Sequence, residues 1–78
     1  MSSNLERVKK VVSQQLEVDV NTIQLISYLV DDLGADSLDN VELILALEEE
    51  FNIEINESEA DKFFQIKSVL AYLQSKGQ

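Results

Sequence analysis

The sequence predicts an all-α fold: a small four-helix bundle of three longer helices and one short helix, with a long loop between the first two. Three observations support this prediction. The chain has 78 residues and no cysteine, which gives one domain, residues 1–78, with a single core and no disulfides. Apolar residues recur at helical spacing in separate segments, and helix-capping residues precede several of these segments.

The first expected helix and the connection after it are both rich in apolar residues. The helix has its apolar positions at helical spacing, and they are Leu5, Val8, Val12 and Leu16. Its expected cap is Ser2 or Ser3. The connection spans residues 18–36, and its apolar members are Val18, Val20, Ile23, Leu25, Ile26, Tyr28, Leu29, Val30 and Leu33. They are too many for a free linker, so we expect this loop to lie over the core.

Three more helices follow from caps and periodicity. The second is expected from Ser37 to Phe51, with Asp36 as its N-cap. The third is short: it begins at the capping box of residues 56–59 and stops near Phe63. The fourth ends near Gly77, and its apolar positions are Ile66, Val69, Leu70 and Leu73.

The charges are unevenly distributed, with a net charge of −9. No lysine or arginine occurs from Glu17 to Asp61, yet every acidic residue except Glu6 lies there. Such a field repels nucleic acid and anionic lipid and attracts basic protein surfaces. The alternative is an acidic surface that only keeps the protein soluble. We expect no membrane insertion, and a cytoplasmic chain or the processed form of an organellar one.

The second expected helix has two apolar stripes, although only one is needed for folding. The stripe expected to face the core consists of Leu43, Ile44, Leu47 and Phe51. The other stripe consists of Leu38, Val41 and Leu45, and it is interleaved with Glu42, Glu48 and Glu49. This outer stripe is a plausible docking site for a partner with an apolar centre and a basic rim. The alternative is scattered surface apolar residues without a role.

Residues 31–51 read DDLGADSLDNVELILALEEEF. The core Asp36-Ser37-Leu38, preceded by Leu33-Gly34-Ala35, resembles the prosthetic-group motif of acyl carrier proteins of the fatty-acid and polyketide type. The resemblance extends at a lower level along nearly all of the chain. It implies that Ser37 carries covalent 4′-phosphopantetheine through a phosphodiester bond, and that the arm's thiol holds acyl groups as thioesters.

The resemblance also implies partners. They are a phosphopantetheinyl transferase and enzymes of fatty-acid synthesis with basic docking surfaces, and the chain is expected to act as a monomer. The implied contacts are Asp36, Leu38, Asp39, Val41, Glu42, Leu45, Glu48 and Glu49. In such carriers the acyl chain folds back between the helices, so the expected acyl pocket is Leu47, Phe63, Phe64 and Ile66.

Phe63 and Phe64 depart from the family pattern, in which an Ile-Thr-like pair precedes the last helix. We expect the two rings to alter which chain lengths are sheltered. The alternative is that both rings merely fill core space. The hydroxyl cap of the last helix is also lost, because Gln65 follows them.

Other kinds of function fit the sequence less well. Ser37 alone could be a helix cap, but Asp36 already fills that role. There is no histidine, and neighbouring carboxylates are too acidic to activate a hydroxyl, so we expect no catalytic residues and no enzyme. An EF-hand is excluded because Asn40 stands where a bidentate glutamate belongs, and we expect no metal site.

Three alternatives stay open for the role of the chain. One is a specialised carrier for polyketide or lipid A synthesis; Ala35, where peptidyl carriers have glycine, argues against a peptide-synthesis role. Another is a carrier-like subunit used structurally in a larger complex. The last is an acidic helical adaptor that is never modified.

Overall fold

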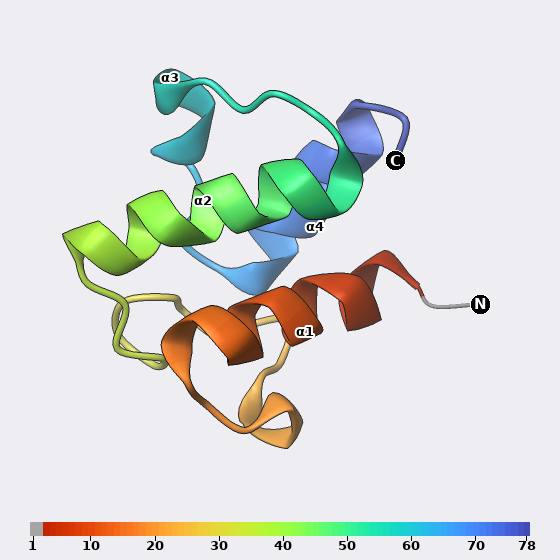
Figure 1. Ribbon diagram of the computed structural model, residues 1–78. Helices are drawn as coiled ribbons and strands as arrows, with labels where there is room; N and C mark the ends of the chain where they lie inside the picture. The colour runs from red at the N-terminus through yellow and green to blue at the C-terminus, as the bar shows by residue number, and fades with distance from the viewer. Residues whose placement is uncertain (1–2) are drawn as a thin grey trace.

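The computed structural model describes residues 3–78, and within them the fold is helical (Figure 1). The elements are α1 (Asn4–Leu16), a 3-10 turn η1 (Val20–Thr22), α2 (Ser37–Phe51), α3 (Glu57–Ala60) and α4 (Ile66–Ser75). α1 and α2 run alongside each other, α4 crosses behind α2, and short α3 lies at one edge. The predicted all-α class, with three longer helices and one short one, is confirmed.

The helix starts follow from local sequence. Ser3 caps α1, since its side chain accepts a hydrogen bond from the Glu6 N–H at 3.1 Å. The alternative cap, Ser2, lies outside the described residues. Asn56 caps α3 by accepting from the Glu59 N–H at 3.0 Å. Each bond satisfies a donor that the first helical turn leaves without a partner.

The core draws on the three longer helices and the long loop. Its fully buried side chains are Val8, Val12, Ile23, Leu29, Leu43, Leu47, Ile66, Val69 and Leu73. Arg7 on α1 adds a polar link to the C-terminal end of α2. Its guanidinium donates to the Glu50 carboxylate at 2.8 Å and to the Glu50 carbonyl at 2.7 Å, and it stacks on the Phe51 ring. Helix α2 is therefore fixed along its inner face and at its end.

The loop of residues 18–36 lies over the core through part of its length: Ile23, Leu29 and Ala35 are buried in the core, and Val18 and Leu33 pack against it. Only Ile23 and Leu29 among its large apolar side chains are fully buried. Five others are exposed by 40% or more: Val20, Leu25, Ile26, Tyr28 and Val30. The loop is therefore not a free linker, but much of its apolar surface faces solvent.

Backbone hydrogen bonds to the start of α4 also hold the loop. The Ile66 and Lys67 N–H groups donate to the carbonyls of Ser27 and Leu25, at 3.1 and 2.9 Å. The Leu29 N–H donates to the Phe64 carbonyl at 2.9 Å. Gln65 makes no side-chain cap for α4, so the loop carbonyls supply the partners that a capping hydroxyl would have given.

Candidate functional site

Ser37 is the first residue of α2 and is exposed to solvent. Its neighbour Asp36 caps the helix: the Asp36 carboxylate accepts from the Asp39 N–H at 2.8 Å, and the Asp39 carboxylate accepts from the Asp36 N–H at 3.2 Å. This reciprocal capping box confirms the predicted cap. Since Asp36 does the capping, the Ser37 hydroxyl remains available for chemistry.

A tight turn brings the loop into the start of α2. Gly34 has φ +75°, which is a conformation that L side chains rarely adopt, and no atom lies within 4 Å of an added Cβ. The backbone angle, rather than a lack of space, therefore requires glycine here. The turn is closed by the Ala35 N–H, which donates to the Leu29 carbonyl at 2.9 Å. Ala35 itself is buried, so Ser37 projects from a fixed base.

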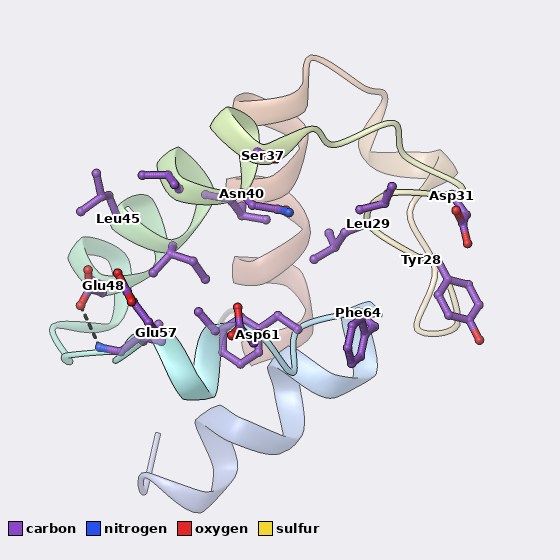
Figure 2. A pocket seen from close by; sticks show the side chains of 17 residues that line it. Tyr28, Leu29, Asp31, Ser37, Asn40, Leu45, Glu48, Glu57, Asp61 and Phe64 are labelled. Carbon is purple, nitrogen blue, oxygen red and sulfur yellow. Dashed lines mark hydrogen bonds between the residues drawn. The ribbon is translucent and has the colours of Figure 1, made fainter.

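An open cavity of about 720 Å³ lies beside Ser37 (Figure 2). The α2 wall contains Ser37, Asn40, Val41, Leu43, Ile44, Leu45 and Glu48. The loop wall contains Tyr28, Leu29, Val30 and Asp31. The wall around α3 contains Ile55, Glu57, Ala60, Asp61, Phe63 and Phe64. Apolar side chains predominate, so the cavity suits an apolar ligand.

The structure separates the four residues expected to form an acyl pocket. Phe63 and Phe64 line the cavity, Phe63 as a largely buried ring and Phe64 as a ring that is 65% exposed. Leu47 and Ile66 do not line it; both are fully buried within the core. A part for Leu47 and Ile66 in an acyl pocket stays a prediction.

Half-buried Ile44 takes the place that we expected for Leu47. It follows Ser37, Asn40 and Val41 at helical spacing. The residues of α2 that share a face with Ser37 could therefore have been predicted to line the cavity. Sequence reasoning missed the rest of the lining, above all Tyr28 and Val30 from the loop and Ile55 and Ala60 from the α3 side. These residues come from distant parts of the chain, and no local pattern signals that they meet.

The outer stripe of α2 is exposed as expected. Leu38, Val41 and Leu45 are 66%, 58% and 57% exposed. The neighbouring carboxylates of Asp36, Glu42 and Glu49 are exposed as well. These side chains form a continuous apolar and acidic strip along the helix that begins at Ser37. We call this strip the α2 strip; its binding of partners stays a prediction.

Two of the predicted contact acids are already engaged inside the protein. Asp39 is half-buried and belongs to the capping box. Glu48 is half-buried, and its carboxylate accepts from the Ile55 N–H at 2.8 Å. Glu48 therefore ties the end of α2 to the chain that leads into α3, and it is a less available contact than Glu42 or Glu49.

The α3 wall of the cavity rests on Tyr72 of α4. The Tyr72 hydroxyl donates to the Glu54 carbonyl at 3.2 Å, and its ring meets Phe63 edge to face with centroids 5.3 Å apart. Burial raises the pKa of the Tyr72 hydroxyl to about 12, and the Glu59 and Glu48 carboxylates add to the shift. Glu59 also forms an ion pair with Lys76, whose Nζ atom lies 3.9 Å from the Glu59 Oε1 atom.

Two structural features are absent from residues 3–78. None of the helices described there combines the length and the apolar character needed to cross a membrane. Within the same residues, no three or more His, Cys, Asp or Glu side chains are grouped in a way that could hold a metal ion.

Comparisons with known proteins point to the same serine-bearing region. Residues 6–73 match the family described as "Phosphopantetheine attachment site". An acyl carrier protein of Campylobacter concisus is 49% identical over 94% of this chain and 95% of its own length. That of Campylobacter lari is 50% identical over 87% and 88%. A solved Mycobacterium tuberculosis structure, described as a candidate acyl carrier protein, superposes with a TM-score of 0.87 at 32% identity, covering 94% of this chain and 97% of that one.

Proposed function

The chain belongs to the phosphopantetheine-attachment family. We propose that Ser37 bears the 4′-phosphopantetheine group, and that the protein uses this group to present acyl chains to enzymes of fatty-acid synthesis. The 4′-phosphopantetheine group is the family's covalent cofactor, and the chain is a carrier rather than an enzyme. The observation that carries the proposal is the exposed Ser37 hydroxyl at the start of α2, beside an apolar cavity.

The residues around Ser37 fit a phosphodiester. The N–H groups and the positive dipole end of α2 favour a negative charge at this position. This attraction offsets part of the repulsion from Asp36 and Asp39, whose carboxylates are themselves engaged with the helix N–H groups. When attached, the group supplies a terminal thiol, which the chain lacks because it has no cysteine.

Intact mass tests the attachment directly. The unmodified protein is incubated with coenzyme A and a phosphopantetheinyl transferase, in parallel with Ser37→Ala and with Ser58→Ala as a matched serine control. We expect wild type and Ser58→Ala to gain the mass of one phosphopantetheine, and Ser37→Ala to gain none. If the folded wild type gains nothing, the proposal fails and the unmodified adaptor becomes the better reading.

The cavity supports a role in sheltering the acyl chain. Phe63 and Phe64 line it, and we propose that they set which chain lengths are sheltered. The test is the hydrolysis rate of long-chain thioesters on wild type and on the double variant Phe63→Ile, Phe64→Thr. An unchanged rate and unchanged stability would mean that the rings only fill space.

The α2 strip supports docking of partner enzymes with basic surfaces. Its apolar side chains supply contact area, and its exposed carboxylates speed association in a salt-sensitive way. We expect the double change Glu42→Lys, Glu49→Lys to lower turnover by most partners at low salt while the fold persists. Glu6→Lys, Glu17→Lys changes the net charge equally on exposed positions elsewhere. Equal effects of the two double changes would contradict a specific docking role.

The proposal also covers the oligomeric state, the cellular location and the pathway of the protein. We propose a monomer in the cytoplasm, and fatty-acid synthesis rather than polyketide or lipid A synthesis as the pathway. Acyl groups released from carrier isolated from cells identify the pathway. Recovery of a stable stoichiometric complex with an enzyme would favour the structural subunit instead.

A further inference from the structure

Ser37 lies at the boundary between two surfaces, because it is the first residue of α2. The α2 strip extends from it along the helix. On its other side lies the loop, and Figure 2 shows Ser37 between Leu45 on one side and Tyr28 and Asp31 on the other. A protein that closes over Ser37 from outside therefore meets both α2 and the loop.

Hydrogen bonds hold the middle of the loop beside the residues that lead into Ser37. The Gly34 N–H donates to the Val30 carbonyl at 3.1 Å, and the Ala35 N–H donates to the Leu29 carbonyl at 2.9 Å. This part of the loop is thus joined to the residues directly before Ser37. A partner that binds it need not order its backbone, which lowers the cost of binding.

The exposed side chains on this part of the loop are of the same kinds as those of the α2 strip. Tyr28 and Val30 are 45% and 57% exposed, and both line the same cavity as Ser37. Asp31 lines it too and is exposed, and the exposed Asp32 carboxylate accepts from the Tyr28 N–H at 2.8 Å. We call Tyr28, Val30 and Asp31 the loop face. Because it combines apolar side chains with a carboxylate, it fits a partner with an apolar centre and a basic rim, as the α2 strip does.

The size of a protein interface decides how much of this surface a partner covers. Even a small, transient interface buries about 500–600 Å² on each protein, which is a circular patch with a radius of about 13 Å. The α2 strip begins at Ser37, so a patch centred on the Ser37 hydroxyl must continue onto the loop face. An enzyme whose reaction takes place at this hydroxyl has to be centred there. Enzymes that act on the thiol at the far end of the arm can dock on α2 with Ser37 at the edge of their interface.

We infer that the loop face is a docking surface for the phosphopantetheinyl transferase, and that enzymes acting on the thiol do not depend on it. The inference rests on the proposed attachment at Ser37. In the attachment reaction the Ser37 oxygen bonds to the phosphorus that bears the pantetheine arm of coenzyme A, adenosine 3′,5′-bisphosphate leaves from that phosphorus, and the serine proton is released. A second copy of this protein is disfavoured as the occupant of the loop face, because each copy has a net charge of −9.

The experiment measures the kinetics of Ser37 modification, with unmodified protein at varied concentration, coenzyme A and the transferase, and with intact mass as the readout. The test variant is Tyr28→Ser, Val30→Ser. The matched control is Leu25→Ser, Ile26→Ser, because these side chains are 46% and 64% exposed in the same loop but do not line the cavity. Neither double change alters the net charge.

A second pair of variants tests the carboxylate of the loop face. Asp31→Lys reverses a charge on the loop face, and Glu6→Lys reverses one at an exposed position on α1. The Tm of each variant shows that the fold persists. Each modified variant is then given to an acyltransferase that transfers an acyl group from acyl-coenzyme A to the thiol of the arm.

We expect Tyr28→Ser, Val30→Ser to raise the KM of the transferase for the carrier about fivefold or more with kcat unchanged, because a docking contact contributes to binding alone. Asp31→Lys should raise this KM most at low salt, since salt screens the exposed charge. The two controls should leave it unchanged. The KM of the acyltransferase should stay the same in all four variants.

Several outcomes would overturn the inference. One is an equal KM in the test variants and their controls, and another is a fall in kcat, which would mean that the changes misplace Ser37. A third is an equal loss with the acyltransferase. Altered self-association, or altered binding to phosphatidylcholine vesicles, with an unchanged KM would assign the loop face to another copy or to lipid instead. Wild type that gains no mass is a separate result, and it would reject the attachment itself.

Discussion

The two main walls of the cavity are held to the protein in different ways. The α2 wall belongs to a 15-residue helix that buries Leu43, Leu47 and Phe51 and is capped by Asp36. The α3 wall belongs to a four-residue helix that has no buried residue. That wall is supported by Glu48 through Ile55, by Tyr72 through Glu54, and by the Phe63 ring.

This difference separates a fixed half of the site from an adjustable half. Ser37 stands on the wall that is built into the core, so its position relative to a docked partner is constant. The opposite wall is built on a four-residue helix with no buried residue, and such regions open locally at a lower free energy than the whole protein unfolds. A carrier needs both properties, since its arm must be presented in a defined place while the cavity admits and releases a ligand.

The largest effect is expected where the α2 wall joins the core. Leu47→Ala removes a fully buried side chain, and we expect it to lower the free energy of unfolding by about 2–5 kcal/mol. Leu45→Ala, at a position that is 57% exposed, should cost less than about 0.5 kcal/mol. Urea unfolding measures both. Similar costs would remove the distinction between the inner and outer faces of α2.

An intermediate and local effect is expected at the joint between the walls. Glu48→Ala leaves the Ile55 N–H without its acceptor, at a cost of about 1–3 kcal/mol. Amide exchange should speed up in residues 53–64 and stay slow in α1. Glu48→Gln keeps an acceptor oxygen and should restore most of the protection. Uniform acceleration across the whole protein would mean that the α3 wall does not open by itself.

The smallest effect is expected at Tyr72, and it depends on pH. Tyr72→Phe removes the hydrogen bond to the Glu54 carbonyl, at a cost of about 0.5–1 kcal/mol near neutral pH. Because folding raises the pKa of Tyr72 from 10.0 to about 12, the folded state holds this proton more tightly than the unfolded state does. The contribution of the protonated Tyr72 hydroxyl to the free energy of unfolding is therefore complete below pH 10 and is lost as the pH rises to about 12.

Urea unfolding of wild type and Tyr72→Phe across this alkaline range checks the sign. Wild type should lose its advantage over the variant as the pH rises, since the other titrating groups are the same in both proteins. A constant difference between the two proteins would show that the Tyr72 proton is not linked to folding.

The sequence predicted the parts of the site that depend on neighbouring residues. The bounds of α2 and its Asp36 cap agree with the structure, as does the Asn56 cap of α3. Those signals are local, because a cap acts within one turn and a stripe follows from helical spacing. The short η1 turn was not expected, and its Asp19 cap gave the available local signal.

The failures concern contacts between distant segments. Helical spacing predicted that Leu47 faces the core, but it did not predict that Leu47 is absent from the lining of the cavity. The loop was expected to lie over the core, and it does so through Ile23, Leu29 and Ala35, but nothing local showed that five of its apolar side chains would be exposed. Nothing local predicts that the loop carbonyls of Leu25 and Ser27 would cap α4.

The capping of α4 by the loop has a consequence for the order of folding. The side chain of Gln65 and the carbonyl of Ile26 that it contacts are 39 residues apart. The first turn of the last helix therefore cannot gain its partners until a segment from the first half of the chain has arrived. Contacts between such distant residues form slowly, since a long stretch of chain must be closed first. The N-terminal turn of α4 is thus expected to be among the last parts of the molecule to become protected during refolding.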